Sequence, residues 1–427
     1  MGAEGTAKFG RTGVTVEEAQ RRIAERIGIG CTGTERVGLL EAFGRRLAEP
    51  IFADAPLPHF RRSGLDGYAV RAADTAGATP QSPARLRVTE TIACGAVPAA
   101  DVAPGTAARI MTGAAVPEGA DAVVMLEMTE AEDRDGVRFV LVGKPMEPGA
   151  NVAGIGGEAE TGRLVLEAGS VVSAGETAVL AAFGHSVVTV ARRPKVAIVA
   201  TGAELLPVDA PAPLAPGRVR DSNSAMVAAL VREAGGTPIL WGAVDDDPSA
   251  AAFAVRSALA EADAVVTTGG VSVGDYDVMT DFCRTWDGEL LFDKVLMRPG
   301  SPTSAGVRDG RPLFMLSGNP GACYVGFELL VRGALLLMQR SSEPAYRAVQ
   351  AVLGEGQYPG IALRRYVRGR CHSENGTLVV VPTGADKSSH LVSLPGTDCL
   401  IVVPPGGRGV RAGDAVSALV RRHSPFA

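Results

Sequence analysis

Glycines, hydroxyls and carboxylates follow three apolar, strand-length runs in the second half of the chain. The segments are Thr201-Gly202-Ala203-Glu204, Asp245-Asp246-Asp247-Pro248, and Gly269-Gly270-Val271-Ser272-Val273-Gly274-Asp275-Tyr276-Asp277. Because glycine has no side chain, its backbone can approach a phosphate group closely. The free N–H groups at the start of a following helix can then bind the phosphate. If the runs are parallel strands, their carboxyl ends meet at one edge of a sheet. The segments therefore predict an anion-binding site at that edge.

Three carboxylates in these segments, those of Glu204, Asp246 and Asp277, could also bind a hard cation. Mg²⁺ prefers oxygen ligands and often bridges to the phosphate of a substrate. Simpler roles stay open, because Asp246 and Asp277 could cap the helices that follow them and Glu204 could be a solvated turn residue. Their common position after strands favours a metal site beside the anion site.

Cations and a further helix start are expected at the same edge. A fourth run, Leu290–Leu296, contains Lys294 and leads to Arg298-Pro299-Gly300, and a fifth run ends in Ser317-Gly318-Asn319-Pro320 before a helix. Lys294 and Arg298 would neutralise the charge of a departing oxyanion. Taken alone, Lys294 is more typical of a charged residue at a strand edge, and Gly-rich turns are common everywhere.

Alternating strands and helices must position these segments. The strand-length runs are Val196–Ala200, Pro238–Val244, Ala264–Thr268, Leu290–Leu296 and Leu313–Leu316. The helical patterns are Ser224–Ala234, Pro248–Ala262, Tyr276–Trp286 and Ala322–Leu337. Asp247 before Pro248 indicates an N-cap, and Thr15 with Glu18 indicates a capping box that begins an earlier helix. The alternation predicts an α/β/α domain around an open parallel sheet.

The rest of the chain is richer in strands and turns. Between Ile51 and Val172, short apolar runs such as Ala122–Met125 are broken by Gly and Pro, which predicts strands with few helices. After about Ser342, similar runs predict a small all-β domain. The segment Val208–Pro216 is rich in Pro and Ala and is expected to be an exposed excursion.

The composition excludes several classes of protein. Of the 427 residues, 46% are hydrophobic and 21% are charged, which is typical of globular domains. A formal net charge of −5 without a long basic run argues against nucleic acid or an anionic membrane as the main partner. The apolar stretches are shorter than the ~20 residues that span a bilayer. Because no secretory signal pattern is present either, a cytoplasmic location is expected.

Cysteine and histidine patterns narrow the chemistry further. The six cysteines are scattered without a CxxC pair, which predicts buried free thiols and neither a disulfide framework nor a zinc site. The five histidines do not form an HxxxH pair, so a histidine-rich metal site has little support. There is no Walker phosphate-binding loop, which argues against a P-loop enzyme.

Motifs in order along nearly the whole chain resemble the MoeA family. They are Ser63–Arg71, Arg109–Ala114 followed by Pro117–Val124, Thr201–Glu204, Gly269–Asp277, Arg298–Pro302 and Gly318–Pro320. Without this resemblance, Asp66 and Thr112 in the first two motifs would be interpreted as plain turn residues. The family is that of the molybdopterin molybdenumtransferases, and the E domain of gephyrin is its animal relative.

The resemblance implies an α/β multidomain fold and a homodimer of four-domain subunits. The expected domains are an α/β/α molybdopterin-binding domain similar to MoaB and MogA (12–33 and 194–343), a small β domain (34–52 and 163–193), a mixed α+β domain (53–162) and a C-terminal β-barrel domain (344–427). The active site is expected to be shared, because the cleft of the α/β/α domain would face the Asp66-bearing domain of the other subunit.

The resemblance also implies a reaction and its residues. Adenylylated molybdopterin would be cleaved in a Mg²⁺-dependent step and molybdate inserted, which gives molybdenum cofactor and AMP. Positions that match important residues of the family are Asp66, Thr112, Glu204, Asp246, Asp277, Lys294, Pro320, Arg368 and Ser389. The last two resemble an oxyanion-binding pair. A molybdopterin adenylyltransferase and proteins that deliver the cofactor to molybdoenzymes are the expected partners. A non-catalytic carrier or scaffold is the alternative, although a pure binder has no need of the three carboxylates.

Some positions depart from the family's pattern. Gly156-Gly157-Glu158 stands where Gly-Glu-Asp is usual, and Glu158 can still supply a carboxylate. Arg298 stands where Lys is common, Ser301 replaces a second Lys, and Ser317 replaces a Pro. Because these changes leave fewer cations near the expected molybdate site, Arg298, Arg368 and Ser389 are expected to compensate. The sequence does not distinguish molybdate from tungstate.

Overall fold

The computed structural model describes residues 12–245, 247–270, 282, 286–341 and 346–421. The chain divides into two compact units. The first unit comprises Met1–Glu49, Ala168–Thr177 and Ser186–Ala427, and the second comprises Pro50–Glu167 and Ala178–His185. Because both units are built from segments distant in sequence, the second unit is inserted into the chain of the first.

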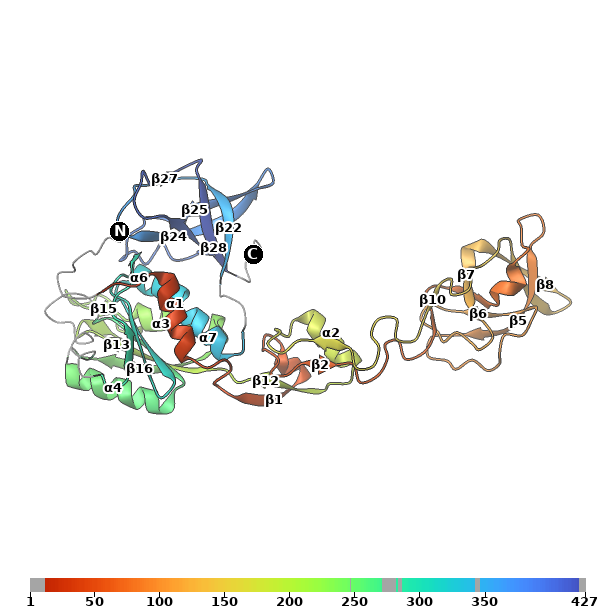
Figure 1. The fold of residues 1–427 in the computed structure, drawn as a ribbon, viewed down its shortest axis with the longest axis horizontal. Helices are drawn as coiled ribbons and strands as arrows, with labels where there is room; N and C mark the ends of the chain where they lie inside the picture. The colour runs from red at the N-terminus through yellow and green to blue at the C-terminus, as the bar shows by residue number, and fades with distance from the viewer. Residues whose placement is uncertain (1–11, 246, 271–281, 283–285, 342–345, 422–427) are drawn as a thin grey trace. The chain divides into compact units, whose positions relative to one another are not determined.

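A six-stranded sheet organises the first unit (Figure 1). Its order is β16 (Thr237–Val244), β13 (Lys195–Thr201), β17 (Ala264–Thr268), β21 (Arg311–Leu316), β20 (Ser304–Arg308) and β18 (Glu289–Phe292). The predicted parallel pairing is confirmed for the first four strands. Strand β20, which was not predicted from the sequence, is antiparallel to both of its neighbours. Two reversals cancel, so β18 points the same way as β21 and ends at the same edge of the sheet.

The predicted strand Leu290–Leu296 is shorter in the structure and ends at Phe292. The chain then leaves the sheet, because the N–H of Val295 donates to the carbonyl of Ser301 and that of Leu296 donates to Val14. A short strand β19 (Met297–Arg298) follows and pairs with a strand of the C-terminal domain. Lys294 therefore lies in a loop and not within a strand.

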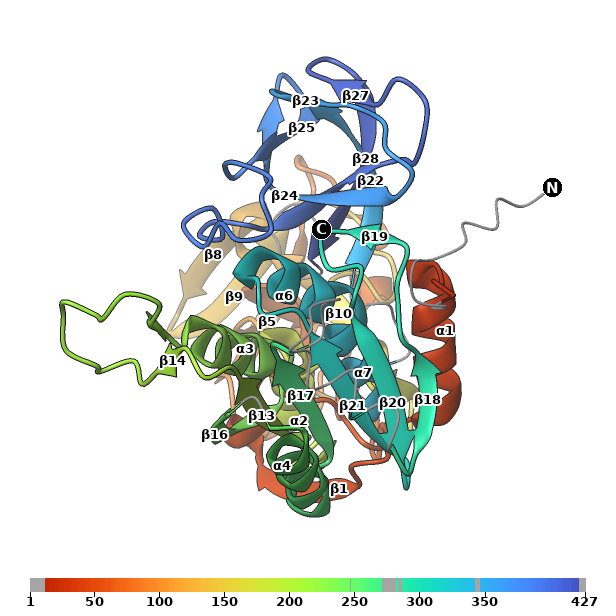
Figure 2. The same cartoon turned by 90° about the vertical axis from the view of Figure 1, so that its left-hand side faces the viewer.

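Helices cover both faces of this sheet (Figure 2). They are α1 (Val16–Arg26), α3 (Ser222–Glu233), α4 (Pro248–Glu261) and a continuous helix made of α6 (Pro320–Gly326), the π-helical segment η4 (Phe327–Val331) and α7 (Arg332–Met338). Alternate residues of β13 separate the two cores: Ile198 packs with α1, α3 and the last helix, whereas Val199 packs with α4. The predicted three-layer arrangement is confirmed.

Helix starts follow the predicted capping signals. The hydroxyl of Thr15 accepts from the N–H of Glu18 at the start of α1, and Asp247 accepts from the N–H groups of Ser249 and Ala250 at the start of α4. Helix α3 begins before the predicted Ser224, because Asp221 is its cap. The predicted helix Tyr276–Trp286 lies outside the described residues except for its members 282 and 286.

Among the described residues, Pro320–Met338 is the one helix that is long and apolar enough to cross a membrane by length and composition. Its mean hydropathy reaches 1.5 within these 19 residues, whereas no membrane-spanning stretch was expected from the sequence. However, 83% of that window is buried inside the protein. The helix packs in the core of the first unit, so its apolar character is explained by burial among neighbouring strands and helices.

The C-terminal part of the first unit is a β-barrel, as predicted. Its strands are β22 (Tyr346–Leu353), β24 (Arg364–Glu374), β25 (Thr377–Pro382), β26 (Cys399–Val403) and β28 (Ala415–Arg421), with β23 (Gln357–Tyr358) and β27 (Val410–Arg411) as a separate pair. The pairing of β24 with β26 closes the sheet on itself. Cys371 and Cys399 are buried in its core, where their sulfurs and an Asp398 oxygen lie within 4.8 Å of one another.

The prediction that the free thiols are buried is wrong at two positions, because Cys31 and Cys94 are exposed. Cys323, Cys371 and Cys399 are buried as predicted. The scattered spacing of the cysteines gave no signal for the Cys371–Asp398–Cys399 cluster, since strand pairing in the barrel is what brings these residues together.

The second unit contains its own six-stranded sheet. The order is β7 (Ala122–Met125), β4 (Gly67–Val70), β6 (Thr106–Ile110), β5 (Ala84–Ile92), β9 (Val137–Val142) and β8 (Thr129–Arg134). The described helical segments here are short, Ala72–Thr75, Leu126–Met128 and the end of α2 (Ala174–Ala182), which confirms the predicted predominance of strands. Gly67 is required at the β4–β7 contact, because a Cβ atom there would lie 1.8 Å from the carbonyl oxygen of Val124.

Small two-stranded sheets occur where a separate β domain was expected. Strand β1 (Thr34–Gly38) pairs with β12 (Val187–Ala191) in the first unit, and β2 (Ile51–Phe52) pairs with β11 (Leu164–Leu166) in the second. Another short pair joins β3 (Arg62–Ser63) to β10 (Val152–Ala153). The four-domain boundaries themselves stay a prediction.

Candidate functional site

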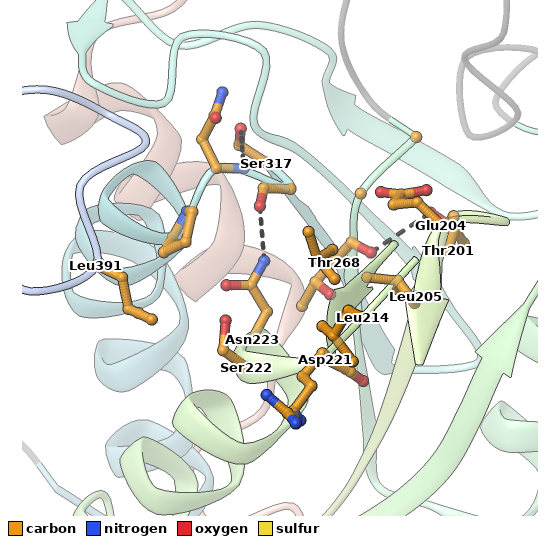
Figure 3. Close-up of a pocket in the computed structure, with 18 residues that line it drawn as sticks. Thr201, Glu204, Leu205, Leu214, Asp221, Ser222, Asn223, Thr268, Ser317 and Leu391 are labelled. Carbon is orange, nitrogen blue, oxygen red and sulfur yellow. Dashed lines mark hydrogen bonds between the residues drawn. The ribbon is translucent and has the colours of Figure 1, made fainter. Parts of the chain in front are cut away.

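A cavity of about 770 Å³ opens at the carboxyl ends of β13, β17 and β21 (Figure 3). Its lining includes the predicted residues Thr201, Gly202, Glu204, Gly269, Gly270, Ser317, Gly318, Asn319 and Pro320. The sequence reasoning missed Leu205, Leu214, Val219, Arg220, Asp221, Ser222, Asn223, Thr268 and Leu391. The structure thus brings the predicted turns of three strands to one pocket.

Two glycines allow the turns of β13 and β17 to approach closely. Gly269 and Gly270 have φ values of +99° and +64°, which other residue types rarely adopt. A Cβ atom on Gly269 would lie 2.4 Å from the carbonyl oxygen of Thr201, and one on Gly318 would lie 3.3 Å from the Cα of Gly269. A side chain on Gly269 or Gly318 would therefore push these turns apart.

Helix α3 adds a second helix start to the one at α6. Asp221 caps α3 by accepting a hydrogen bond of 2.9 Å from the N–H of Ser224, and its carboxylate lines the cavity. The side chain of Asn223 donates from Nδ2 to the carbonyl of Gly318 over 2.8 Å, as drawn in Figure 3. This bond joins the start of α3 to the loop before α6. Residues of both helix starts line the same cavity, where helix dipoles favour a negatively charged group.

A two-stranded ribbon forms an apolar wall of the cavity. Strands β14 (Leu205–Leu206) and β15 (Val219–Arg220) pair, and Leu205, Leu214 and Val219 line the cavity together with Leu391 of the barrel domain. The predicted exposed excursion at residues 208–216 is confirmed for most of its residues, but Leu214 is half-buried and lines the cavity. Leu391 and these three side chains can contact a flat heterocycle, because they offer apolar surface beside the polar turns.

Glu204 is the predicted carboxylate that the structure places in the cavity. Its side chain is exposed and turns back over Gly202, where a Cβ atom would lie 2.5 Å from Oε2. Asp246, Asp277, Ser272 and Gly274 lie outside the described residues. The oxygen donors of Glu204, Thr201 and Asp221 fit the preference of Mg²⁺ for oxygen ligands.

The predicted cations lie at the same sheet edge but do not line the described part of the cavity. Lys294 follows β18, and its carbonyl accepts from Val14. Arg298 is exposed on β19. Pro299 and Gly300 are buried, and Gly300 packs near the carbonyl of Ala322 in α6. Arg220 is instead the cation that lines the cavity, and its guanidinium donates to the carbonyl of Ala210 over 2.6 and 3.1 Å.

Arg368 lies behind the first turn of α6. Its side chain is only 2% exposed, and a Cβ atom on Gly321 would lie 2.6 Å from Nη1. Nη2 donates to the hydroxyl of Ser393 over 2.9 Å. The predicted partner Ser389 is exposed, so the hydroxyl that the structure places against Arg368 belongs to Ser393. Sequence spacing indicated the loop but not which of its serines turns inward.

Asp66 and Thr112 lie together in the second unit. The N–H and hydroxyl of Thr112 donate to Oδ1 of Asp66 over 2.6 and 2.7 Å. These two bonds, the side-chain bond first, lower the pKa of Asp66 below its usual value. Glu158 also lies in this unit and forms a 2.5 Å ion pair with Arg62. The motif that contains Asp66 and the motif that contains Thr112 thus form one arrangement, in which the threonine favours the ionised carboxylate.

Replacing Thr112 by valine is expected to raise the pKa of Asp66 towards that of a free aspartate. The change removes the hydroxyl donor, which is the largest cause of the lowered pKa, and leaves the backbone N–H bond. The measurement is an NMR titration of the Asp66 carboxyl carbon in both proteins. Thr129→Val, which removes a hydroxyl bonded to the carbonyl of Leu126, is the control and should leave the titration unchanged. An unaltered midpoint in Thr112→Val would contradict the assigned cause.

Three protein-family models match successive parts of the chain. The MoeA N-terminal region (domain I and II) matches residues 14–184, a probable molybdopterin binding domain matches residues 197–336, and the MoeA C-terminal region (domain IV) matches residues 350–420. The second match contains the strands whose ends line the cavity, including Thr201, Glu204 and Gly269. The third contains Arg368.

Similar proteins match over nearly their whole length. A protein of Bacillus subtilis named molybdopterin molybdenumtransferase is 42% identical over 412 residues, which cover 96% of this chain and 95% of the relative. One of the same name from Staphylococcus aureus (strain Mu50) is 38% identical over 411 residues and 96% of both chains. A crystal structure titled as the molybdopterin biosynthesis MoeA protein of Pyrococcus horikoshii is similar with a TM-score of 0.82 and 31% identity, covering 96% of this chain and all of that one.

Proposed function

The chain belongs to the MoeA family of molybdopterin molybdenumtransferases, and we propose that it inserts molybdate into adenylylated molybdopterin with release of AMP. The observation that carries this proposal is the cavity in which Glu204 stands beside the glycine turns and two helix starts. The turns suit phosphate groups, the apolar wall of the ribbon suits a pterin, and the carboxylate suits a cation held against the phosphates.

The cavity's own residues would bind and orient the substrate. Backbone N–H groups at the start of α3 would bind phosphate oxygens. Leu205, Leu214 and Leu391 would contact the heterocycle and exclude water. Glu204, with Thr201 and Asp221, would hold a Mg²⁺ ion, which when bound neutralises negative charge on the phosphoanhydride. Asp246 and Asp277 stay predicted ligands of the same ion.

Molybdate would bind near Arg368. Nε and Nη1 of its guanidinium have no hydrogen-bond partner among the described residues, and burial lowers its pKa. A buried guanidinium without an anion is costly, and a tetrahedral oxyanion would satisfy it. Arg365 lies on the same strand, so its charge would compensate for the positions where the chain lacks the lysines common in the family.

A second copy of the chain is proposed to complete the site. In this proposal an Asp66-bearing loop of one subunit would stand opposite the cavity of another, and the bonds from Thr112 would keep that carboxylate charged. We also propose two kinds of partner: an adenylyltransferase that supplies the adenylylated molybdopterin, and proteins that deliver the finished cofactor to molybdoenzymes. The oligomeric state can be measured by analytical ultracentrifugation of the purified full chain.

The central experiment measures AMP release from adenylylated molybdopterin. We expect the purified protein to release AMP stoichiometrically with molybdenum cofactor when Mg²⁺ and molybdate are present, and to stop when the cation is chelated. The observation that favours the alternative, a non-catalytic carrier, is the apolar lining of the cavity, because binding a pterin needs no catalytic group. Tight binding of the pterin without AMP release in the complete mixture would support the carrier and contradict the transferase.

A further inference from the structure

Two arginines of strand β24 are buried with incomplete hydrogen bonding. Arg365 is 8% exposed to solvent, and Arg368 is 2% exposed. Nε of Arg365, and Nε and Nη1 of Arg368, have no hydrogen-bond partner within the part of the chain that the structure describes. Because a buried N–H group without an acceptor costs free energy, these donors indicate a place for an anion.

A carboxylate already stands beside this pair. Oδ2 of Asp386 lies 3.7 Å from Nε of Arg365, and the Asp386 side chain is 11% exposed. This separation makes an ion pair but is too long for a hydrogen bond, so the carboxylate balances charge without satisfying the donor. The backbone on either side of Asp386 is fixed by Arg368, whose Nη2 contacts the carbonyls of Ala385 and Lys387 at 3.4 and 3.3 Å.

The surroundings of Asp386 are predominantly positive. Burial raises the pKa of Asp386, and the charges of Arg365 and Arg368 on β24 and of Arg298 on β19 offset part of that rise. Tyr358 of β23 is also nearby, and its ring lies 5.7 Å from the Arg365 guanidinium. Burial is the largest effect and raises the pKa of Asp386 above its usual value. The pKa of Asp386 therefore depends on two opposing effects, burial and the positive charge of the arginines. An additional anion bound to these arginines would weaken the second effect.

We propose that Asp386 is the internal counter-ion of the oxyanion site and that it takes up a proton from solvent when the oxyanion binds. The inference rests on the proposed function, because it assumes that molybdate binds at Arg368. A dianion held by Arg365 and Arg368 repels the neighbouring carboxylate, and protonation of that carboxylate removes the repulsion. Asp386 is thus a residue that tunes affinity and not one that contacts the reacting pterin.

The expected pH dependence has a definite sign. Oxyanion binding favours protonated Asp386, so the affinity rises as the pH falls towards the pKa of Asp386 and falls as the pH rises above it. The proton is taken up on binding and is returned to solvent when the oxyanion leaves. A neutral residue at this position would give high affinity at every pH and no linked proton.

The test is calorimetric titration of the full chain with sodium molybdate alone at pH 6 and pH 8, in buffers of different ionisation enthalpy. We expect wild type to bind more tightly at pH 6 with net proton uptake. Asp386→Asn should bind about tenfold more tightly than wild type at pH 8 and take up no proton. Glu374→Gln, an exposed carboxylate on the same strand, is the control and should behave like wild type.

The outcomes separate this inference from the proposed function. If Asp386→Asn bound molybdate more weakly than wild type and took up the same number of protons, the counter-ion role of Asp386 would be overturned. Asp386 would then have a purely structural role. Absence of molybdate binding in wild type would overturn the oxyanion proposal itself. Asp386→Ser is the second variant if the asparagine protein does not fold, and the same tenfold gain and loss of proton uptake are expected of it.

Discussion

Replacing Glu328 by glutamine is expected to lower the free energy of unfolding of the first unit by about 3–5 kcal/mol. The Glu328 side chain is completely buried in the π-helical segment. Its carboxylate accepts from Arg332 over 2.5 and 3.0 Å and also from Arg421 and Tyr346. Removing the negative charge leaves the buried guanidinium of Arg332 and the partly buried one of Arg421 without their main counter-charge. That loss is far larger than the loss of a surface ion pair.

Glu233→Gln is the matched control for this prediction. Glu233 contacts the same two arginines, at 3.1 Å from Arg332 and 2.9 Å from Arg421, but its side chain is 50% exposed. Water can replace much of that interaction, so a loss below about 1 kcal/mol is expected. Urea unfolding followed by circular dichroism measures both variants. Equal losses in the two proteins would contradict the assignment of Glu328 as the centre of the network.

Replacing Glu204 by glutamine is expected to reduce the rate of AMP release by about 100-fold while the fold is kept. This corresponds to about 2.7 kcal/mol of transition-state stabilisation. Glutamine preserves the shape of the side chain but removes the charge that would hold the cation, and the exposed position makes few packing contacts. The measurement is single-turnover AMP release at a Mg²⁺ concentration that just saturates the wild type, together with a thermal melt.

Asp209→Asn is the control for the Glu204 variant. Asp209 is an exposed carboxylate five positions further along the chain, and it does not line the cavity. Its rate should equal that of wild type. If Glu204→Gln also released AMP at the wild-type rate, the carboxylate would have no part in the chemistry, and the cation would have to be held by other residues. Partial recovery at high Mg²⁺ concentration would support a weakened cation site.

The parts of the fold that follow local rules could be predicted from the sequence. Strands β13 and β17 are continuous apolar runs because both of their faces are buried, and α4 begins where Asp247 and Pro248 indicate. Strand β20 could not be found in this way. Its residues, Ser304–Arg308, are few and include Gly306, and the strand exists because β21 provides a pairing edge.

The candidate site shows the same division. Turn residues such as Gly269 and Gly318 could be predicted, since they follow strands whose carboxyl ends must share an edge. Asp221 and Asn223 could not, because the ribbon before them belongs to no predicted strand of the main sheet. The inward direction of Ser393 and the burial of Arg368 depend on barrel closure, which has no local signal.

The contact between helix α1 and the last helix of the α/β/α layer has a consequence for synthesis on the ribosome. The side chain of Gln20 donates to the carbonyl of Leu329 over 2.7 Å, across 309 positions of sequence. During translation, α1 emerges long before this partner, while the whole second unit is made in between. That inserted unit can complete its own sheet first, whereas the nascent first helix must keep Ile23 from other apolar surfaces until most of the polypeptide has left the exit tunnel.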